Sequence, residues 1–279
     1  MLKRILTALV AICVLIPVLF FSNTIVFPIA VAIVSLISLF EIFKCTGSEK
    51  KVALVIPIYL YGVAAPFILR YLDPIRFALI SFIVAALYAI YMFAQIIWSH
   101  GKKKFADTAA IYFLSIYIIA AMNSIVYIRD FGNEGKYIYL LIFLGAWITD
   151  IFAYFTGYFF GKHKLIEDVS PKKTIEGSIG GTVFCAASFG LFGWIIGKFI
   201  LGRPANIIFL LICGVILSVV AQVGDLIMSV IKRHYGIKDF GKIFPGHGGM
   251  LDRFDSILAV SLGLATICMF VTLTGITLL

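Results

Sequence analysis

The sequence predicts an all-α, polytopic integral membrane protein with about nine transmembrane helices. Composition is the first reason: the 279 residues are 62% hydrophobic and only 13% charged, and their mean hydropathy is +1.08. Spacing is the second: apolar runs of about 20 residues, the length that a helix needs to cross a bilayer, recur along the whole chain. These runs do not alternate in polarity as barrel strands would, so helices must satisfy the backbone in lipid.

The apolar runs define the spans in order. They cover residues 5–21, 24–43, 52–72, 75–98, 106–128, 137–160, 178–200, 205–232 and 256–278. The first run is long for a signal peptide and no small-x-small cleavage site follows it, so we interpret it as a retained membrane helix. We divide the chain into residues 1–130, with about five spans, and residues 131–279, which hold the charged loops 161–177 and 233–255.

Lysine and arginine predict the orientation. Of the 23 basic residues, 17 fall at the N-terminus, in the loops near 44–51, 99–105, 161–177 and 233–255, or at Lys232. This bias predicts that these segments lie in the cytoplasm and that the C-terminus lies outside. The net charge of +9 favours anionic lipid headgroups or an anionic substrate, although the positive-inside rule alone explains much of it. Nucleic acid is a poor candidate partner for so hydrophobic a chain.

Asp150 and Asp225 are carboxylates within predicted spans. Asp150 lies about halfway along the sixth span, and Asp225 lies toward the cytoplasmic end of the eighth. Because a carboxylate at bilayer depth costs about 2.5–3.5 kcal/mol on insertion scales, such residues usually face a bundle interior and serve a function. The alternative is an interhelical hydrogen bond from a protonated Asp.

Asp225 belongs to a polar stripe on its helix. Ser218, Gln222, Asp225, Ser229 and Lys232 follow one another at spacings of four, three, four and three residues. The stripe is either a polar helix–helix seam or one wall of a water-filled cavity.

The loop at 161–177 has features of a phosphate site. Its run Ser-Pro-Lys-Lys-Thr, residues 170–174, offers two ammonium groups and two hydroxyls, and Thr174 with Gly177 suits the start of a helix. Helix N-termini bind phosphate readily. Positive-inside lysines beside an ordinary helix cap are an equal alternative.

The loop from Ile231 to Ser256 concentrates glycine and charge in the stretch FPGHGGMLDRFDS. Gly246, Gly248 and Gly249 allow close backbone approach and positive φ angles. Asp252 and Asp255, three residues apart, share one face of a helix that starts near residue 250, and such paired carboxylates suit Mg²⁺. The alternative, that both acids only complement the helix dipole, leaves the glycines and the histidine unexplained.

Folding of this loop can bring Asp225 to Asp252 and Asp255 at the membrane interface. Acids and cations would then form a mixed cluster of the kind that polyphosphate chemistry requires. The cations are Lys172, Lys173, Lys232, Arg233, Lys238, Lys242 and Arg253.

These residues resemble the signature of the phosphatidate cytidylyltransferases, also called CDP-diacylglycerol synthases. The signature spans 27 residues and reads SVIKR at 229–233, KDFG at 238–241 and FPGHGGMLDRFD at 244–255. SPKKTIEG at 170–177 and DIFAYFTG at 150–157 are similar to two further stretches typical of the family. The resemblance covers roughly residues 145–256, while residues 1–130 are alike only in being apolar and multi-span.

The resemblance implies that CTP and phosphatidic acid react to give CDP-diacylglycerol and pyrophosphate with Mg²⁺, catalysed by residues 131–279. Asp225, Asp252 and Asp255 are the implied metal ligands, and Lys232 and Arg233 complete the implied catalytic set. A second, monovalent cation is a further candidate. Residues expected at the substrates are Asp150, Ser170, Lys172, Lys173, Thr174, Ser229, Lys238, His247, Gly248, Gly249 and Arg253.

Two rival functions stay open at this point. A CTP-dependent polyprenol or lipid kinase would transfer the γ-phosphoryl group and release CDP. An ion or proton transporter would use Asp150 and Asp225 and would not turn over CTP. The short chain suggests a bacterial inner or plasma membrane protein with its active site facing the cytoplasm, surrounded by membrane lipids. A homo-oligomer is neither indicated nor contradicted.

Overall fold

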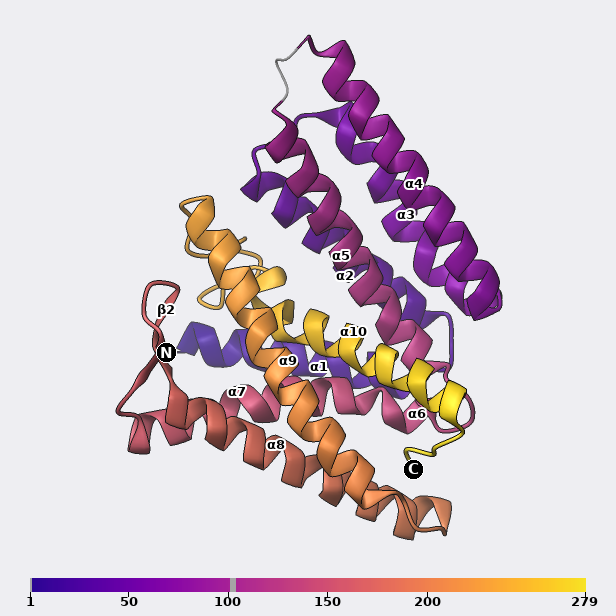
Figure 1. Ribbon diagram of the computed structural model, residues 1–279, viewed down its shortest axis with the longest axis vertical. Helices are drawn as coiled ribbons and strands as arrows, with labels where there is room; N and C mark the ends of the chain where they lie inside the picture. Colours follow the sequence, from indigo (N-terminus) through magenta and orange to yellow (C-terminus); the bar gives the residue numbers. More distant parts are fainter. Residues whose placement is uncertain (1, 101–103) are drawn as a thin grey trace. The chain divides into compact units, whose positions relative to one another are not determined.

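The computed structural model describes residues 2–100 and 104–279 (Figure 1). Residues 101–103 of the predicted loop 99–105 therefore lie outside the described residues. Contacts divide the chain into two units. The first unit comprises Met1–Tyr127 with Tyr235–Arg253, and the second comprises Ile128–His234 with Phe254–Leu279.

The fold confirms the prediction of an all-α, multi-span membrane protein. Within the described residues, eight helices are long and apolar enough to cross a membrane. The first predicted span corresponds to α1 (Leu2–Phe20), whose apolar part, Leu9–Phe20, is shorter than the others.

The first unit is built mainly from α1 and four long helices. These are α2 (Val26–Cys45), α3 (Val52–Tyr71), α4 (Pro74–Trp98) and α5 (Phe105–Arg129). Asp73 caps α4 by accepting a hydrogen bond from the backbone N–H of Arg76 at 3.0 Å, and Pro74 occupies the first helical position, where no N–H is needed. Only 11% of the apolar stretch of α4 is buried, so most of that helix can face lipid.

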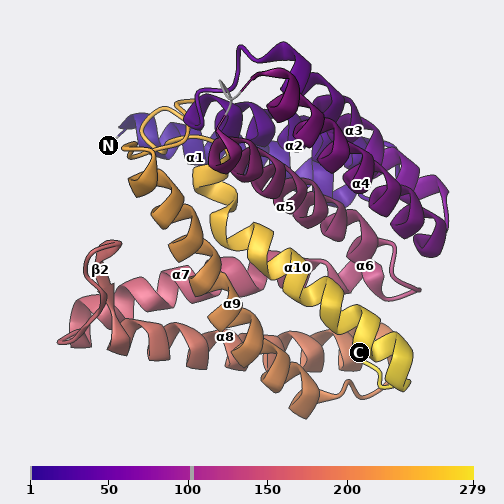
Figure 2. The same ribbon diagram turned by 45° about the horizontal axis from the view of Figure 1, so that its top comes forward.

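The second unit contains the remaining elements. In chain order these are α6 (Gly135–Ile138), α7 (Leu140–Phe160), β1 (Lys164–Ile166), β2 (Ser170–Thr174), α8 (Ile175–Ile195), the π-helix η1 (Ile196–Leu201), α9 (Ile207–His234) and most of α10 (Leu251–Thr274). The two strands form an antiparallel hairpin within the predicted loop 161–177. Figure 2 shows α7 and α8 lying side by side, with α9 packed against α8.

Small residues allow α7 and α8 to approach closely. A Cβ atom added to Gly177 would lie 2.6 Å from the carbonyl oxygen of Ala153, and one added to Gly181 would lie 2.7 Å from that of Thr149. The two glycines are four residues apart on one face of α8, the spacing at which transmembrane helices commonly pack backbone to backbone. This contact fixes the start of α8, and hence the hairpin that precedes it.

Two helices begin before their apolar spans, as the polar sequence ahead of those spans predicts. Helix α8 begins at Ile175, directly after the predicted start at Thr174, and α10 begins at Leu251, where a start near residue 250 was predicted. Both helices extend into polar sequence because hydrogen-bond acceptors are available at their ends. Thr174 is the N-cap of α8, as its sequence context predicts, and its hydroxyl accepts from the N–H of Gly177 at 3.1 Å.

Candidate active site

Three carboxylates gather in the second unit, where α9 crosses α10. Gly224 makes the crossing close, because an added Cβ would collide with Ala259 and would lie 3.1 Å from the carbonyl oxygen of Asp255. Asp225 follows this glycine directly, and it repels Asp255 electrostatically, as does Asp150 of α7. The hydroxyl of Ser256 donates to Asp150 at 3.2 Å, which holds that carboxylate beside α10.

The hairpin brings a cation to these acids. The ammonium nitrogen of Lys173, in β2, lies 2.5 Å from Oδ2 of Asp225. Both side chains are about one quarter exposed, so the ion pair is partly shielded from solvent. Lys232, near the end of α9, also attracts Asp255 electrostatically. Of the predicted cations, these two therefore accompany the carboxylates within the second unit.

Glu176 stabilises the hairpin that carries Lys173. Its Oε2 accepts from the backbone N–H groups of Lys162 and His163 at 3.1 and 3.2 Å, and its Oε1 lies 2.6 Å from Nδ1 of His163. The end of α7 and the start of α8 are thus joined through one side chain. The sequence places Glu176 in the motif SPKKTIEG but does not predict this role.

The polar stripe of α9 has two different parts. Ser218 and Gln222 are buried and join a hydrogen-bonded seam with α7 and α8. Within it, Thr149 donates to Ser218 at 3.0 Å, and Gln222 donates to the hydroxyl of Thr182 at 3.2 Å. This part of the stripe is a helix–helix seam, and the charged part, from Asp225 onward, lies toward the end of α9.

The glycine-rich loop is organised by Asp252 within the first unit. Oδ2 of Asp252 accepts from the backbone N–H groups of Phe240 and Gly249, at 2.8 and 2.9 Å. Gly248 has a φ of +89°, and an added Cβ would lie 2.8 Å from the same oxygen. Glycine is therefore required at this position both by its conformation and by the carboxylate packed against it.

A second carboxylate holds the same loop and was missed in the sequence. Glu41 of α2 accepts from the N–H of Met250 through Oε1 at 2.9 Å, and from the N–H of Leu251 through Oε2 at 2.8 Å. It is 2% exposed. The available signal was a single acid in an apolar run of residues 24–43, the same signal that identified Asp150 and Asp225.

The other predicted residues differ in exposure. Lys172 and Arg233 in the second unit, and Lys238 and Arg253 in the first, are exposed. Ser170 and Ser229 are half-buried. In the first unit, Nδ1 of His247 is buried and has no hydrogen-bond partner among the described residues.

The carboxylates are compatible with Mg²⁺ in donor chemistry, although they do not form a complete protein cage. Among the described residues, no group of three or more His, Cys, Asp or Glu side chains is arranged to hold a metal ion. Magnesium usually takes only one or two carboxylates and completes its octahedron with water and substrate phosphates. Asp225 of α9 and Asp255 of α10, at the crossing beside Gly224, supply carboxylate oxygens of this kind.

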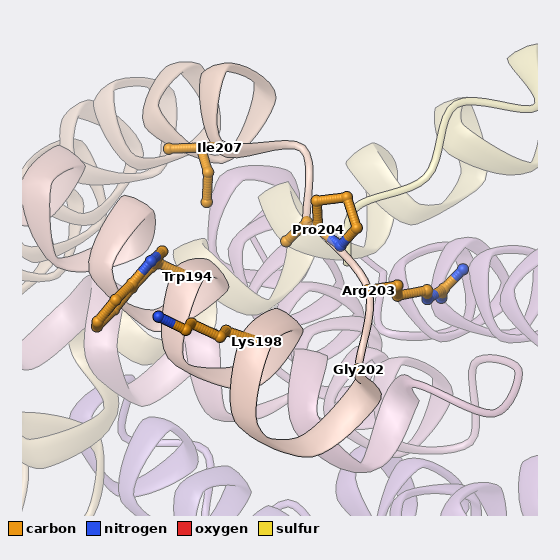
Figure 3. Close-up of a pocket in the computed structure, with 7 residues that line it drawn as sticks. Trp194, Lys198, Gly202, Arg203, Pro204 and Ile207 are labelled. Carbon is orange, nitrogen blue, oxygen red and sulfur yellow. The ribbon is translucent and has the colours of Figure 1, made fainter.

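A pocket of the second unit lies away from these acids. It has a volume of about 340 Å³ and is formed around the turn after η1, where Trp194, Lys198 and Arg203 line it (Figure 3). Lys198 lies over the Trp194 ring, and Arg203 pairs with Glu134. The pocket lies at the C-terminal end of α8, whereas Lys173 lies just before its N-terminal end. The pocket therefore does not contribute to the carboxylate cluster.

Comparison with known proteins gives consistent matches. The model of the cytidylyltransferase family matches residues 2–271. A phosphatidate cytidylyltransferase of Staphylococcus haemolyticus is 34% identical over 268 residues, which cover 92% of this chain and 95% of the relative. One of Staphylococcus aureus is 35% identical over 269 residues, with the same coverage, and one of Staphylococcus saprophyticus is 41% identical over 162 residues, 58% of this chain and 59% of the relative.

Proposed function

The chain belongs to the cytidylyltransferase family and is a nucleotidyltransferase, and we propose that it converts CTP and phosphatidic acid to CDP-diacylglycerol and pyrophosphate. The relatives that cover most of its length carry the name phosphatidate cytidylyltransferase. The observation that supports this reaction in the molecule itself is the pairing of Lys173 with Asp225 beside Asp255. Both substrates are anionic, and such a cluster offers both cations and metal-binding oxygens to them.

In the proposed reaction, a non-bridging oxygen of the lipid phosphate attacks the α-phosphorus of CTP. The bond from the α-phosphorus to the oxygen that bridges it to the β-phosphorus breaks. Its electron pair stays on that oxygen, and pyrophosphate leaves. The attacking phosphate monoester is already largely ionised near pH 7, since its second pKa is about 6, so no general base is required. His247 is accordingly assigned to the loop around the nucleotide rather than to proton transfer.

The chain's own residues neutralise charge and orient the substrates. Asp225 holds the Lys173 ammonium group at the cluster, where it can meet the triphosphate, and Lys232 adds positive charge at the end of α9. Asp225 and Asp255 would hold Mg²⁺, with Asp252 as the third predicted ligand, and a monovalent second cation stays in the proposal. When bound there, Mg²⁺ would supply Lewis-acid stabilisation of the negative charge that develops on the leaving pyrophosphate.

The remaining predicted residues keep their proposed contacts with the substrates. They lie in the hairpin, along α9 and in the glycine-rich loop, and Asp150 is proposed to line the substrate site. These residues are Ser170, Lys172, Thr174, Ser229, Arg233, Lys238, Gly248, Gly249 and Arg253. We propose that the hairpin and the loop after α9 face the cytoplasm, where CTP is available, because basic residues concentrate in these segments.

Position-specific labelling of CTP tests the reaction. Purified protein in detergent micelles with phosphatidic acid should move label from the α-phosphate of CTP into a lipid product, and label from the γ-phosphate into pyrophosphate. Label from the γ-phosphate in the lipid, with release of CDP, would instead identify a lipid kinase. Intact CTP after incubation would contradict both enzymatic readings and leave the transporter.

A further inference from the structure

We propose that Glu41 is a positioning residue for this reaction: from within α2, its carboxylate fixes the backbone at which α10 begins. The inference rests on the proposed function, because the first turns of α10 carry Asp252 and Asp255, which are proposed to hold the metal ion. Glu41 lies far from these residues in sequence, in the part of the chain that shares no motif with the family signature.

The contact is a helix cap supplied by another helix. The first residues of α10 cannot all satisfy their own N–H groups, and the residue before the helix, Met250, has no side-chain oxygen to accept one. Glu41 supplies acceptors from outside the helix: each of its two carboxylate oxygens accepts one backbone N–H, those of Met250 and of the first helical residue, Leu251. A carboxylate is also favoured by the positive end of the helix dipole.

Two glycines are shaped to this carboxylate. A Cβ atom added to Gly249 would lie 2.6 Å from Oε2 of Glu41, and one added to Gly241 would collide with Oε1. Neither glycine has a positive φ angle, so conformation does not explain them. Close packing against the Glu41 carboxylate does, and for Gly249 it adds a structural reason to the proposed contact with substrate.

Glu41 and Asp252 together accept hydrogen bonds from the three consecutive backbone N–H groups of residues 249–251. Asp252 takes the N–H of Gly249, and Glu41 takes the next two, although the two carboxylates repel each other. A carboxylate within the membrane costs free energy, and a second carboxylate nearby increases that cost. A cap that served only the stability of the fold could use a neutral side chain instead. Because Glu41 occupies the N–H groups of Met250 and Leu251, the N–H of Gly249 is left for Asp252, and this hydrogen bond orients the Asp252 side chain.

The consequence for the reaction passes through the backbone. With Met250 and Leu251 anchored, the first turn of α10 presents Asp252, and the next turn of the same helix presents Asp255. Loss of the anchor would let the start of the helix fray and displace both carboxylates. Small displacements of this kind are expensive in catalysis: about 1 Å can cost on the order of 100-fold in rate.

The test compares Glu41→Gln with Glu134→Gln, an identical chemical change at a residue that pairs with Arg203 in the second unit. Glu41→Gln keeps the shape of the side chain but removes its charge and points an NH₂ group at a backbone N–H. We expect kcat to fall by roughly 10- to 100-fold, the range seen when the partners of metal ligands are lost, with little change in the KM for CTP. Glu134→Gln should behave as the unmodified protein.

Hydrogen exchange supplies a readout that does not depend on activity. In Glu41→Gln, the amides of residues 249–251 should exchange faster, while those of α7 and α8 and the thermal midpoint in detergent stay as in Glu134→Gln. Unchanged kcat, unchanged exchange at 249–251, or accelerated exchange throughout the chain would each overturn the positioning role. The last result would show that Glu41 serves the stability of the whole fold.

A second route covers the case in which Glu41→Gln does not fold. Gly241→Ala, at a residue not assigned to the substrates, leaves the charge in place but pushes a methyl group against the carboxylate, so it should reproduce the loss of kcat and the faster exchange. If Gly241→Ala has normal kcat, the proposal fails. An unmodified protein that forms no pyrophosphate would refute the proposed function instead, while exchange at 249–251 would still report whether Glu41 anchors the loop.

Discussion

The ammonium nitrogen of Lys173 lies 2.5 Å from Oδ2 of Asp225, which joins the β-hairpin to the carboxylate cluster of α9 and α10. Lys173 comes from the predicted loop 161–177, and Asp225 comes from the eighth predicted span. Their pairing gives the hairpin a definite task, because it delivers a cation to acids that would otherwise repel one another.

Lys173→Gln should therefore lower kcat strongly. Removal of the ammonium group takes away positive charge from the proposed triphosphate site and leaves Asp225 without its partner, so we expect a loss on the order of 100-fold in kcat. Lys173→Arg should retain more activity than Lys173→Gln, although its fork geometry differs. The rate of pyrophosphate release gives kcat for each variant. Lys136→Gln, in α6, serves as the control.

Asp255→Asn should abolish turnover without preventing membrane insertion. The change keeps the size of the side chain but removes one of the two carboxylates that would hold Mg²⁺. Yield in the membrane fraction and a monodisperse elution profile would establish folding. Near-normal turnover would rule Asp255 out as a metal ligand.

Asp252→Asn should show a different combination of effects. Besides losing turnover, it should loosen the glycine-rich loop, because Oδ2 of Asp252 accepts from both Phe240 and Gly249. Limited proteolysis of residues 235–250 should be faster in Asp252→Asn than in Asp255→Asn. Equal cleavage rates would mean that the loop does not depend on this carboxylate.

Activity should vanish in EDTA and return when Mg²⁺ is added in excess. The expectation follows from the chemistry of the donors, since carboxylate oxygens and phosphates are the ligands that Mg²⁺ prefers. Turnover that persists in the chelator would contradict the metal-assisted mechanism. A second titration, with K⁺ and Na⁺ at constant ionic strength, tests the monovalent cation.

The orientation is open to cysteine labelling in a chain whose native cysteines have been replaced. Lys50→Cys, in the loop after α2, should react with an impermeant maleimide only from the cytoplasmic side, and Pro204→Cys, in the turn before α9, only from outside. Both residues are exposed, so access to reagent is not the limiting factor. Labelling of Lys50→Cys from outside would reverse the topology.

The spans and the cap at Thr174 could be predicted because their causes are local. About 20 apolar residues suffice to indicate a membrane helix, and a hydroxyl three residues before Gly177 suffices to indicate its start. A cluster containing Lys173 and Asp225 could be predicted, but which of the seven cations pairs with Asp225 could not, because that depends on how α8 and α9 pack. Glu41 was missed for a similar reason: its partners are backbone amides more than 200 residues away, which leave no pattern in side-chain identity.

The buried seam of Thr149, Ser218, Thr182 and Gln222 has a consequence for the movement of lipid substrate and product between the two leaflets of the membrane. These side chains satisfy one another across α7, α8 and α9, so the polar stripe of α9 does not continue as a wet path past Asp225. Within this seam, the four side chains are engaged with one another and offer a lipid headgroup at the carboxylates no path toward the other leaflet. We therefore expect substrate and product to share a single leaflet.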